Sequence, residues 1–346
     1  MNIFITGCYR SGTTLIQKYI NSQIDTRIQY QPMIFLFMAI KELFYMENNI
    51  RTNKYIGKNY SMNNEDEKLN SFLNQKINIS KLRPYLKKHR PTDKTLLQNF
   101  NKIIYSLEKS KDLISIYTDF LDTRNSLSST GSQKIRGVKE ILCHEFVPYF
   151  LKHSVQVIIV IRNPVDVIKS LNHGNLSSDY TGGPRPTLLN LRNWRENSET
   201  AILNINHQNL IIIQYEKFIS DKYYRTNRLN TLNINFRTND LDNLIDESGK
   251  QWKTNTSYSS NKEGNHRQVN DFTKKYIGAT CYGEMKFFNY DPSINEQERE
   301  IIIKNYKEQY KIISRPYYEN SYSTDPVNIK YEIERKTDYD LSSFTK

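Results

Sequence analysis

The stretch ITGCYRSGTTLIQKYI, residues 5–20, decides the fold, because it joins a strand end, a glycine-bounded turn and the start of a helix. In ATP-binding loops, two glycines separated by four residues are followed by Lys and then by Ser or Thr. Gly7 and Gly12 have this spacing, but a threonine stands at the lysine position and Arg10 lies inside the turn. Backbone amides and the helix dipole converge on an anion in such a turn. The stretch therefore predicts a phosphate-binding loop of unusual composition.

Hydroxyl side chains surround the second glycine of this loop. Ser11, Thr13 and Thr14 can donate hydrogen bonds to phosphate oxygens, and Arg10 adds a positive charge. An ordinary capped turn also uses Ser and Thr, but the glycines, hydroxyls and arginine together favour a phosphate site. We therefore expect the phosphate to be bound by Arg10, Ser11, Gly12, Thr13 and Thr14.

Predicted strands and helices alternate along the rest of the chain. The run VQVIIVI at 155–161 is continuously apolar, as is typical of a strand buried on both faces of a parallel sheet. Such alternation predicts an α/β fold with a central parallel sheet flanked by helices. Strands are predicted at 3–6, 27–30, 135–139, 155–161 and 210–215, and helices at 13–22, 33–46, 143–153, from Pro164, at 187–205 and at 296–313.

We expect a single domain over residues 1–346, without internal repeats. Residues 46–134 are rich in Asn, Lys and Ser and are predicted to form an inserted, mostly helical cap. Residues 316–346, rich in Tyr, Asn and Ser, are predicted to be a loosely ordered tail. Within the cap, weak helical periodicity predicts helices near 66–78 and 95–109. The stretch DTRNSLSSTGSQ at 122–133 is predicted to be its closing loop.

Composition limits the possible partners. The net charge of +12 attracts anions, but Lys and Arg are scattered rather than gathered in a block, so no nucleic-acid partner is expected. The three cysteines form no CxxC pair, which favours a reducing compartment. The first residues lack a signal-peptide pattern, and the apolar stretch at 33–40 is too short to span a membrane. These features predict a cytoplasmic protein without a transmembrane segment.

A second motif, IRNPVDVIKS at 161–170, follows the most apolar strand. An NTPase or kinase would usually place a magnesium-binding acid at such a strand end, whereas Arg162 suits a second phosphate. Asn163 and the following proline are typical of a helix start. Ser170 follows the cap by about two helical turns, so its hydroxyl can face the helix start. We expect Arg162 and Ser170 to bind one anion, and we predict no metal site.

With two phosphate sites and neither the lysine nor the metal acid, the chain resembles the PAPS-dependent sulfotransferases, where PAPS is 3′-phosphoadenosine 5′-phosphosulfate. GCYRSGTTL resembles their loop for the 5′-phosphosulfate, and IRNPVDVIKS resembles their site for the 3′-phosphate. IIIQYEKF resembles a strand whose tyrosine, here Tyr215, lies near the adenine. CYGEMKFFNYD resembles a segment near the family's C-terminal end. The resemblance covers residues 3 to 291 but does not account for the cap or the tail.

The resemblance implies in-line transfer of a sulfuryl group from PAPS to a hydroxyl or amine, with release of PAP and no required metal. Arg10 would stabilise the departing 5′-phosphate. Lys139 resembles a family lysine near the transferring group, and Arg267 would correspond only loosely to a late arginine at the 3′-phosphate. A small molecule, a carbohydrate, a lipid or a protein tyrosine are all compatible as the acceptor.

Glu140 is our predicted general base, with His144 and Glu145 as other candidates. The sequence departs from the family here, because no histidine follows Lys139 closely and Gln31 replaces a glutamate that some members have before a proline. We expect Lys139 to keep Glu140 ionised at neutral pH, and we expect His144 and Glu145 to be solvated. Because strand side chains alternate, Lys139 and Glu140 can share a site only where the strand has turned into loop.

Two other functions stay open at this point. One is an atypical P-loop kinase, against which the missing lysine and the missing metal acid count. The other is a nucleotide- or polyanion-binding protein without catalysis. Magnesium-dependent ATP hydrolysis would support the first, and binding of PAP without turnover would support the second.

Overall fold

A computed structural model describes most of the chain, and its described residues belong to two compact units. Unit 1 comprises Met1–Gly7, Gly12–Val160 and residues from Asn206 to 252. Unit 2 comprises Cys8–Ser11, Ile161–Ile205 and residues from 269 to 305. The described residues are 1–50, 52–53, 57–61, 66–75, 77–91, 94–109, 112–125, 134–172, 187–234, 236–237, 240–242, 244, 251–252, 269 and 271–305.

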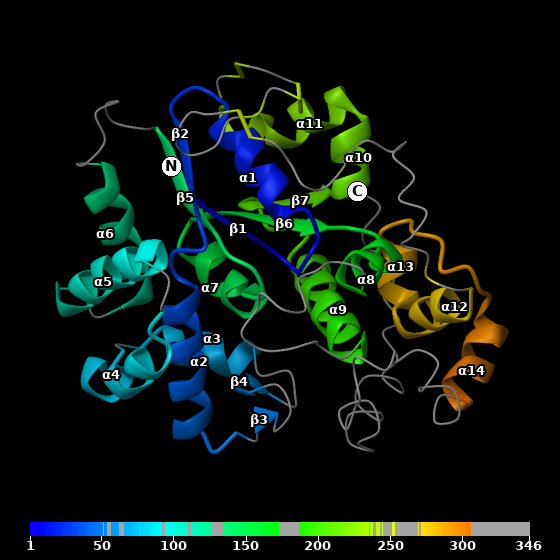
Figure 1. The fold of residues 1–346 in the computed structure, drawn as a ribbon, viewed down its shortest axis with the longest axis horizontal. Coiled ribbons are helices and arrows are strands. Elements are labelled where there is room, and N and C mark those ends of the chain that lie inside the picture. The colour runs from blue at the N-terminus through cyan, green and yellow to red at the C-terminus, as the bar shows by residue number, and fades with distance from the viewer. Residues whose placement is uncertain are drawn as a thin grey trace. The chain divides into compact units, whose positions relative to one another are not determined.

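A five-stranded sheet forms the centre of unit 1, in the order β2-β5-β1-β6-β7 (Figure 1). β1 pairs in parallel with β5 and β6, and β2 pairs in parallel with β5. The predicted α/β class with a central parallel sheet is therefore confirmed. The strands are β1 (Asn2–Gly7), β2 (Thr26–Tyr30), β5 (Ile135–Lys139), β6 (Gln156–Ile161) and β7 (Leu210–Gln214).

Aromatic side chains attach helices to one face of this sheet. Phe4 of β1 stacks on Phe150 of α7 (Val147–Lys152), with ring centroids 4.5 Å apart. Phe37, from α2 (Ile34–Glu47), packs edge to face with the same Phe4 ring. Such pairs stabilise a core beyond the burial of their area. They fix α2 and α7 against the strand that leads into the phosphate loop.

Figure 1 shows α1 with α10 and α11 on the opposite side of the sheet from α7. These helices span α1 (Thr13–Asn21), α10 (Tyr215–Ser220) and α11 (Lys222–Leu229). The rings of Tyr19 in α1 and Phe218 in α10 meet edge to face, with centroids 5.1 Å apart. The C-terminal half of α1 thus packs against the segment that follows the last strand.

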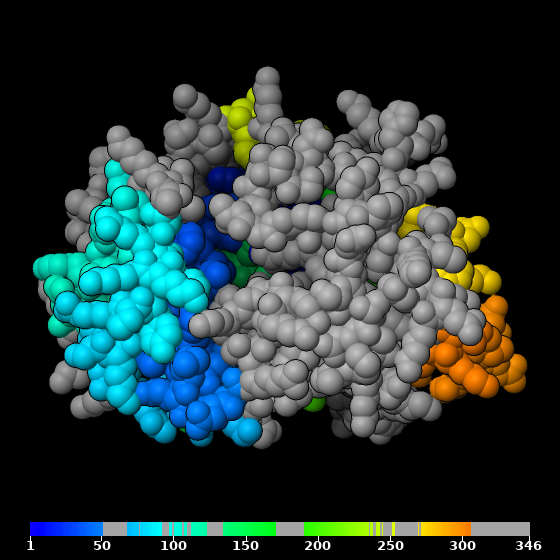
Figure 2. Space-filling model, turned by 60° about the horizontal axis from the view of Figure 1, so that its bottom comes forward, coloured from blue at the N-terminus to red at the C-terminus, as the bar shows by residue number. Residues whose placement is uncertain are grey.

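The region predicted as a cap contains more regular structure than expected. The helices predicted near 66–78 and 95–109 are confirmed, although the first ends at Leu73. The prediction of a loop from 122 is wrong as far as Asn125, which is still helical, and 126–133 lie outside the described residues. Figure 2 shows the surface of α4 and α5, in cyan, beside the blue surface of α2. The elements are β3 (Thr52–Asn53), β4 (Gly57–Ser61), α3 (Asp66–Leu73), α4 (Ile79–Lys88), α5 (Lys94–Lys109) and α6 (Leu113–Asn125).

Unit 2 is mainly helical in the part that the structure describes. Its core includes a buried ion pair in which Arg195 Nε lies 3.1 Å from Glu284 Oε1. The helices predicted from Pro164 and at 187–205 are confirmed, whereas the tail at 316–346 lies outside the described residues. No described helix in either unit is long and apolar enough to cross a membrane. The helices of unit 2 are α8 (Pro164–Asn172), α9 (Thr187–Leu203), α12 (Asp271–Thr280), α13 (Tyr282–Phe287) and α14 (Glu296–Lys304).

Candidate functional site

The predicted phosphate loop connects β1 to α1. Gly12 caps the start of α1 with a φ of 96°, a left-handed conformation that glycine adopts without strain. Its carbonyl accepts the first helical hydrogen bond from the Leu15 amide at 2.9 Å. The first turn of α1 holds no acidic residue, so its dipole favours an anion. Thr13 is buried and Thr14 is half-buried within this turn.

The two sequence motifs meet inside unit 2. Arg10 Nε donates a 2.8 Å hydrogen bond to Ser170 Oγ, although the two residues lie 160 positions apart. Arg162 Nη1 donates to the Arg10 carbonyl at 3.0 Å. The Arg162 carbonyl in turn accepts from Trp194 Nε1 at 2.7 Å, which fixes the strand end against α9. Arg10 thus contacts both residues of the second motif, Ser170 through its guanidinium and Arg162 through its carbonyl. Arginines and a hydroxyl are donors that fit phosphate groups.

The start of α8 has the predicted form. The Asn163 side chain accepts a hydrogen bond from the Val165 amide at 2.9 Å, and Pro164 is the first helical residue. Ser170 lies two turns further along and is buried. The cap thereby orients the helix that carries Ser170 to Arg10.

Ser11 and Cys8 stabilise the turn itself. Ser11 Oγ donates to the Cys8 carbonyl at 2.8 Å, and both side chains are buried. Burial raises the pKa of the Cys8 thiol to about 12, despite the opposing effects of the Ser11 hydrogen bond and the Arg162 charge. The thiol is therefore protonated and unreactive at neutral pH. In this conformation the hydroxyl of Ser11 holds the loop closed rather than pointing outward.

Lys139 ends β5 in a buried position. Its ammonium lies 3.7 Å from the ring centroid of Tyr30, which ends the neighbouring strand β2. A cation over an aromatic face is held by the ring quadrupole. Only 1% of Lys139 is exposed, compared with 38% of Tyr30. Tyr30 is a neighbour of the candidate site that the sequence analysis missed, although the paired ends of β2 and β5 bring it there.

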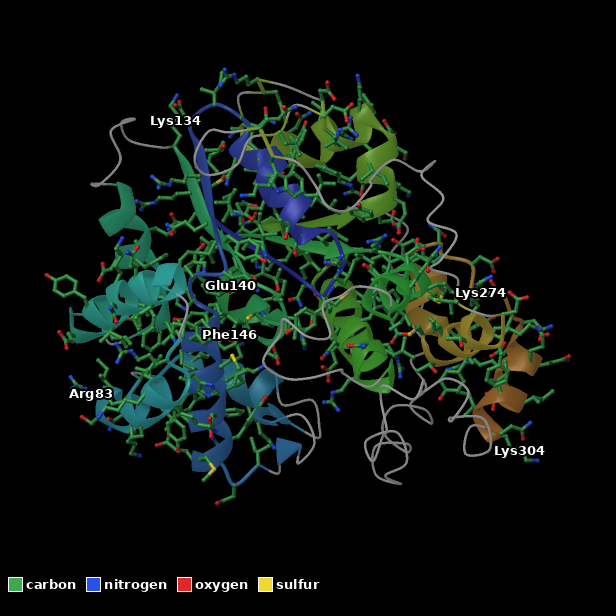
Figure 3. All side chains as sticks on the ribbon, in the orientation of Figure 1. Arg83, Lys134, Glu140, Phe146, Lys274 and Lys304 are labelled. Atoms are coloured by element: carbon green, nitrogen blue, oxygen red, sulfur yellow. The ribbon has the colours of Figure 1, made fainter. Side chains whose placement is uncertain are left out.

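Glu140 is buried inside unit 1. In Figure 3 it lies among the central elements, whereas Arg83 and Lys134 lie at the surface of the same unit. The Glu140 amide still donates to the Ile5 carbonyl at 2.8 Å, so the ladder continues past the end of β5. The Glu140 side chain points to the start of α2, where Oε1 accepts from the Met33 amide at 2.7 Å. Oε2 has no hydrogen-bond partner in the part of the chain that the structure describes.

The expected charge state of Glu140 is wrong. Complete burial raises its pKa to about 8, and neither the Met33 amide nor the Lys139 charge offsets this effect. Lys139 is the charge that the sequence places beside this carboxyl, whereas no local pattern indicates that α2 covers it. At neutral pH the group is therefore mainly protonated.

The expectation that His144 and Glu145 are solvated is also wrong. His144 begins a short 3-10 turn, η1 (His144–Phe146), and is buried. Its Nδ1 lies 3.8 Å from Glu145 Oε2, and Lys41 Nζ lies 2.7 Å from Glu145 Oε1. Burial alone would raise the pKa of Glu145, but the charges of His144 and Lys41 together lower it. Lys41 comes from α2, so no local pattern could have indicated it.

Tyr215 and Arg267 complete the predicted set. Tyr215 was expected to end the last strand but is the first residue of α10. Its ring lies against Gly12, the second glycine of the phosphate loop. Arg267 lies outside the described residues. Over the residues with a described position, no three His, Cys, Asp or Glu side chains cluster in a way that could hold a metal ion.

No protein-family model matches the sequence, and a search of curated proteins finds no match. Similar solved structures include the sulfotransferase domain of the Synechococcus PCC 7002 olefin synthase, with 14% identity, a TM-score of 0.37 and coverage of 70% of this chain and 76% of that chain. The sulfotransferase domain from the curacin biosynthetic pathway has 14% identity, a TM-score of 0.34 and the same coverage of 70% and 76%. Retinol dehydratase, solved with androsterone and PAP, has 15% identity, a TM-score of 0.28 and coverage of 67% and 59%.

The raised pKa of Glu140 predicts how stability changes with pH. Between about 4.5 and 8 the folded state keeps a proton that the unfolded state has released, so the free energy of unfolding falls as pH rises. We expect Glu140→Gln to remove this part of the decline, because its amide does not titrate. Urea unfolding of both proteins at several pH values measures the difference. Parallel curves for the two proteins would contradict the raised pKa.

Proposed function

We propose that this chain is a sulfotransferase that moves the sulfuryl group of PAPS to a hydroxyl or amine acceptor and releases PAP. The hydrogen bond from Arg10 to Ser170 carries the proposal, because it joins the first motif to the second. Arg162 and Ser170 bind the 3′-phosphate in this proposal. Arg10, Gly12, Thr13, Thr14 and the amides of their loop bind the 5′-phosphosulfate.

The transfer requires positioning and charge rather than a covalent intermediate. The acceptor oxygen or nitrogen attacks sulfur, the bond from sulfur to the 5′-phosphate oxygen breaks, and the phosphate leaves as part of PAP. Arg10 stabilises the negative charge that grows on this phosphate, and Lys139 supplies a second cation near the transferring group. Both assignments come from the resemblance of their motifs.

Glu140 is the proposed base, in the ionised form that appears as pH approaches 8. Its Oε2 is free to accept a proton, since Oε1 already binds the Met33 amide and the described residues offer Oε2 no partner. A base works best when its pKa lies near the working pH, and a pKa of about 8 meets this condition. His144 is the other candidate, with Glu145 beside its ring.

Isothermal calorimetry tests the cofactor assignment. We expect PAP to bind equally well in EDTA and in magnesium, because the proposed sites use arginines, hydroxyls and amides rather than a bound metal. ATP should compete poorly, since it lacks a 3′-phosphate. Loss of PAP binding in EDTA, together with tight binding of ATP in magnesium, would favour the atypical kinase instead.

A further inference from the structure

Tyr215 lies closer to the phosphate loop than its resemblance to an adenine neighbour implies. A Cβ atom at Gly12 would come within 2.2 Å of Tyr215 Cδ2 and 2.4 Å of Cε2. The ring edge therefore occupies the space that any side chain at position 12 would need. We infer that Tyr215 is a positioning residue that fixes the end of the phosphate loop at Gly12. It thereby also positions the backbone amides that bind the 5′-phosphosulfate. This inference rests on the proposed function.

The contact has two independent geometric supports in unit 1. Gly12 has a φ of 96°, a conformation that side chains other than glycine adopt at a cost, so backbone and ring both select glycine. Tyr215 is only 6% exposed and is the first residue of α10, directly after β7. The backbone of Tyr215 thus continues from β7 of the sheet, and its ring covers Gly12 at the start of α1.

The rest of α10 keeps the ring in place. Phe218, one turn after Tyr215, packs edge to face on Tyr19 of α1. Arg225 of α11 donates to the Phe218 carbonyl at 2.6 Å, and the Tyr224 hydroxyl accepts from the Gln214 amide at 2.9 Å. Hydrogen bonds with α11 therefore hold the corner between β7 and α10. Tyr215 contacts the loop, whereas Phe218 packs on Tyr19 in the body of α1, and this difference supplies a matched control.

The test compares two ligands that differ at the 5′ end. PAP carries adenine, a 3′-phosphate and a 5′-phosphate, and adenosine 3′-phosphate lacks only the 5′-phosphate. We expect Tyr215→Leu to raise the Kd for PAP about tenfold, the equivalent of one charge-assisted hydrogen bond, and to leave the Kd for adenosine 3′-phosphate unchanged. Tyr215→Phe keeps the ring and should preserve the ratio of the two constants. Phe218→Leu should lower stability without changing that ratio.

Two results would overturn the inference. Equal weakening of both ligands by Tyr215→Leu would place the ring at the adenine, and no weakening of either would remove it from the site. If Tyr215→Leu does not fold, Tyr215→Met gives the same test, because it also removes the ring from Gly12 while keeping a long apolar side chain.

A double-mutant cycle separates this inference from the proposed function. In urea unfolding, Gly12→Ala combined with Tyr215→Leu should cost less than the sum of the single changes, because removing the ring makes room for the Cβ. Additive costs would show that the two residues do not touch in solution. Wild-type protein that binds neither PAP nor adenosine 3′-phosphate would refute the proposed function, and the cycle would still decide the contact.

Discussion

Glu140→Gln is expected to lower turnover by about 10²–10⁴-fold, the typical contribution of a general base. The amide that replaces the carboxyl can still accept the hydrogen bond from the Met33 amide, so the start of α2 should keep its place. It cannot take a proton from the acceptor. Turnover is measured with sulfur-labelled PAPS at saturating acceptor, and PAP affinity is measured alongside as a check that the fold is intact.

The pH dependence distinguishes Glu140 from other groups. Because its pKa is raised to about 8, the wild-type rate should increase as pH rises through 8 and then level off as the carboxyl becomes ionised. Glu140→Gln should lose this rise, whereas His144→Ala should keep it and reduce the rate much less. Near-normal turnover of Glu140→Gln with an inactive His144→Ala would make His144 the base and leave Glu140 a structural partner of α2.

Arg162→Ala is expected to weaken PAP binding about 30-fold or more. The change removes a charged hydrogen bond to the 3′-phosphate, worth about 1.5–3 kcal/mol, and the bond to the Arg10 carbonyl, worth about 0.5–1.5 kcal/mol. Adenosine 5′-phosphosulfate lacks the 3′-phosphate, so its binding should weaken only by the contribution of the bond to the Arg10 carbonyl. Calorimetry with PAP and competition with the second ligand measure both effects.

An exposed arginine provides the control for this change. Arg83 lies at the surface of the cap region, where its Nη2 is 3.7 Å from Glu108 Oε1. Arg83→Ala removes the same charge from the protein and should leave PAP affinity unchanged. Equal losses with PAP and adenosine 5′-phosphosulfate in Arg162→Ala would show instead that Arg162 supports the loop rather than the 3′-phosphate.

The sequence predicted the elements whose cause is local. The apolar run of β6, the glycine spacing of the loop and the Asn163 cap of α8 each specify structure within about ten residues. These are features in which backbone conformation and periodicity determine the outcome. The joint role of Arg162 and Ser170 at one anion stays a prediction; the structure shows that Arg10 contacts Ser170 through its side chain and Arg162 through its carbonyl.

What the sequence did not reveal depends on packing between distant segments. The sequence did not predict α4, a helix that contains Pro84; Asn78 caps it, and Leu82 and Leu86 are buried along one side. The charge state of Glu140 follows from its burial under α2, a segment about 100 residues away. A local pattern records neither the burial of a carboxyl nor the helix that covers it.

Transfer of label from sulfur-labelled PAPS to an acceptor tests the central claim most directly. The wild-type chain would be incubated in EDTA with sugars, lipids, phenols and tyrosine peptides, and products would be separated and counted. We predict labelled acceptor in amounts equal to the PAP released, and transfer by Arg162→Ala about 30-fold slower or more when the PAPS concentration lies below the wild-type Kd. Tight PAP binding with no transfer to any acceptor, or phosphoryl transfer from ATP in magnesium, would contradict the account.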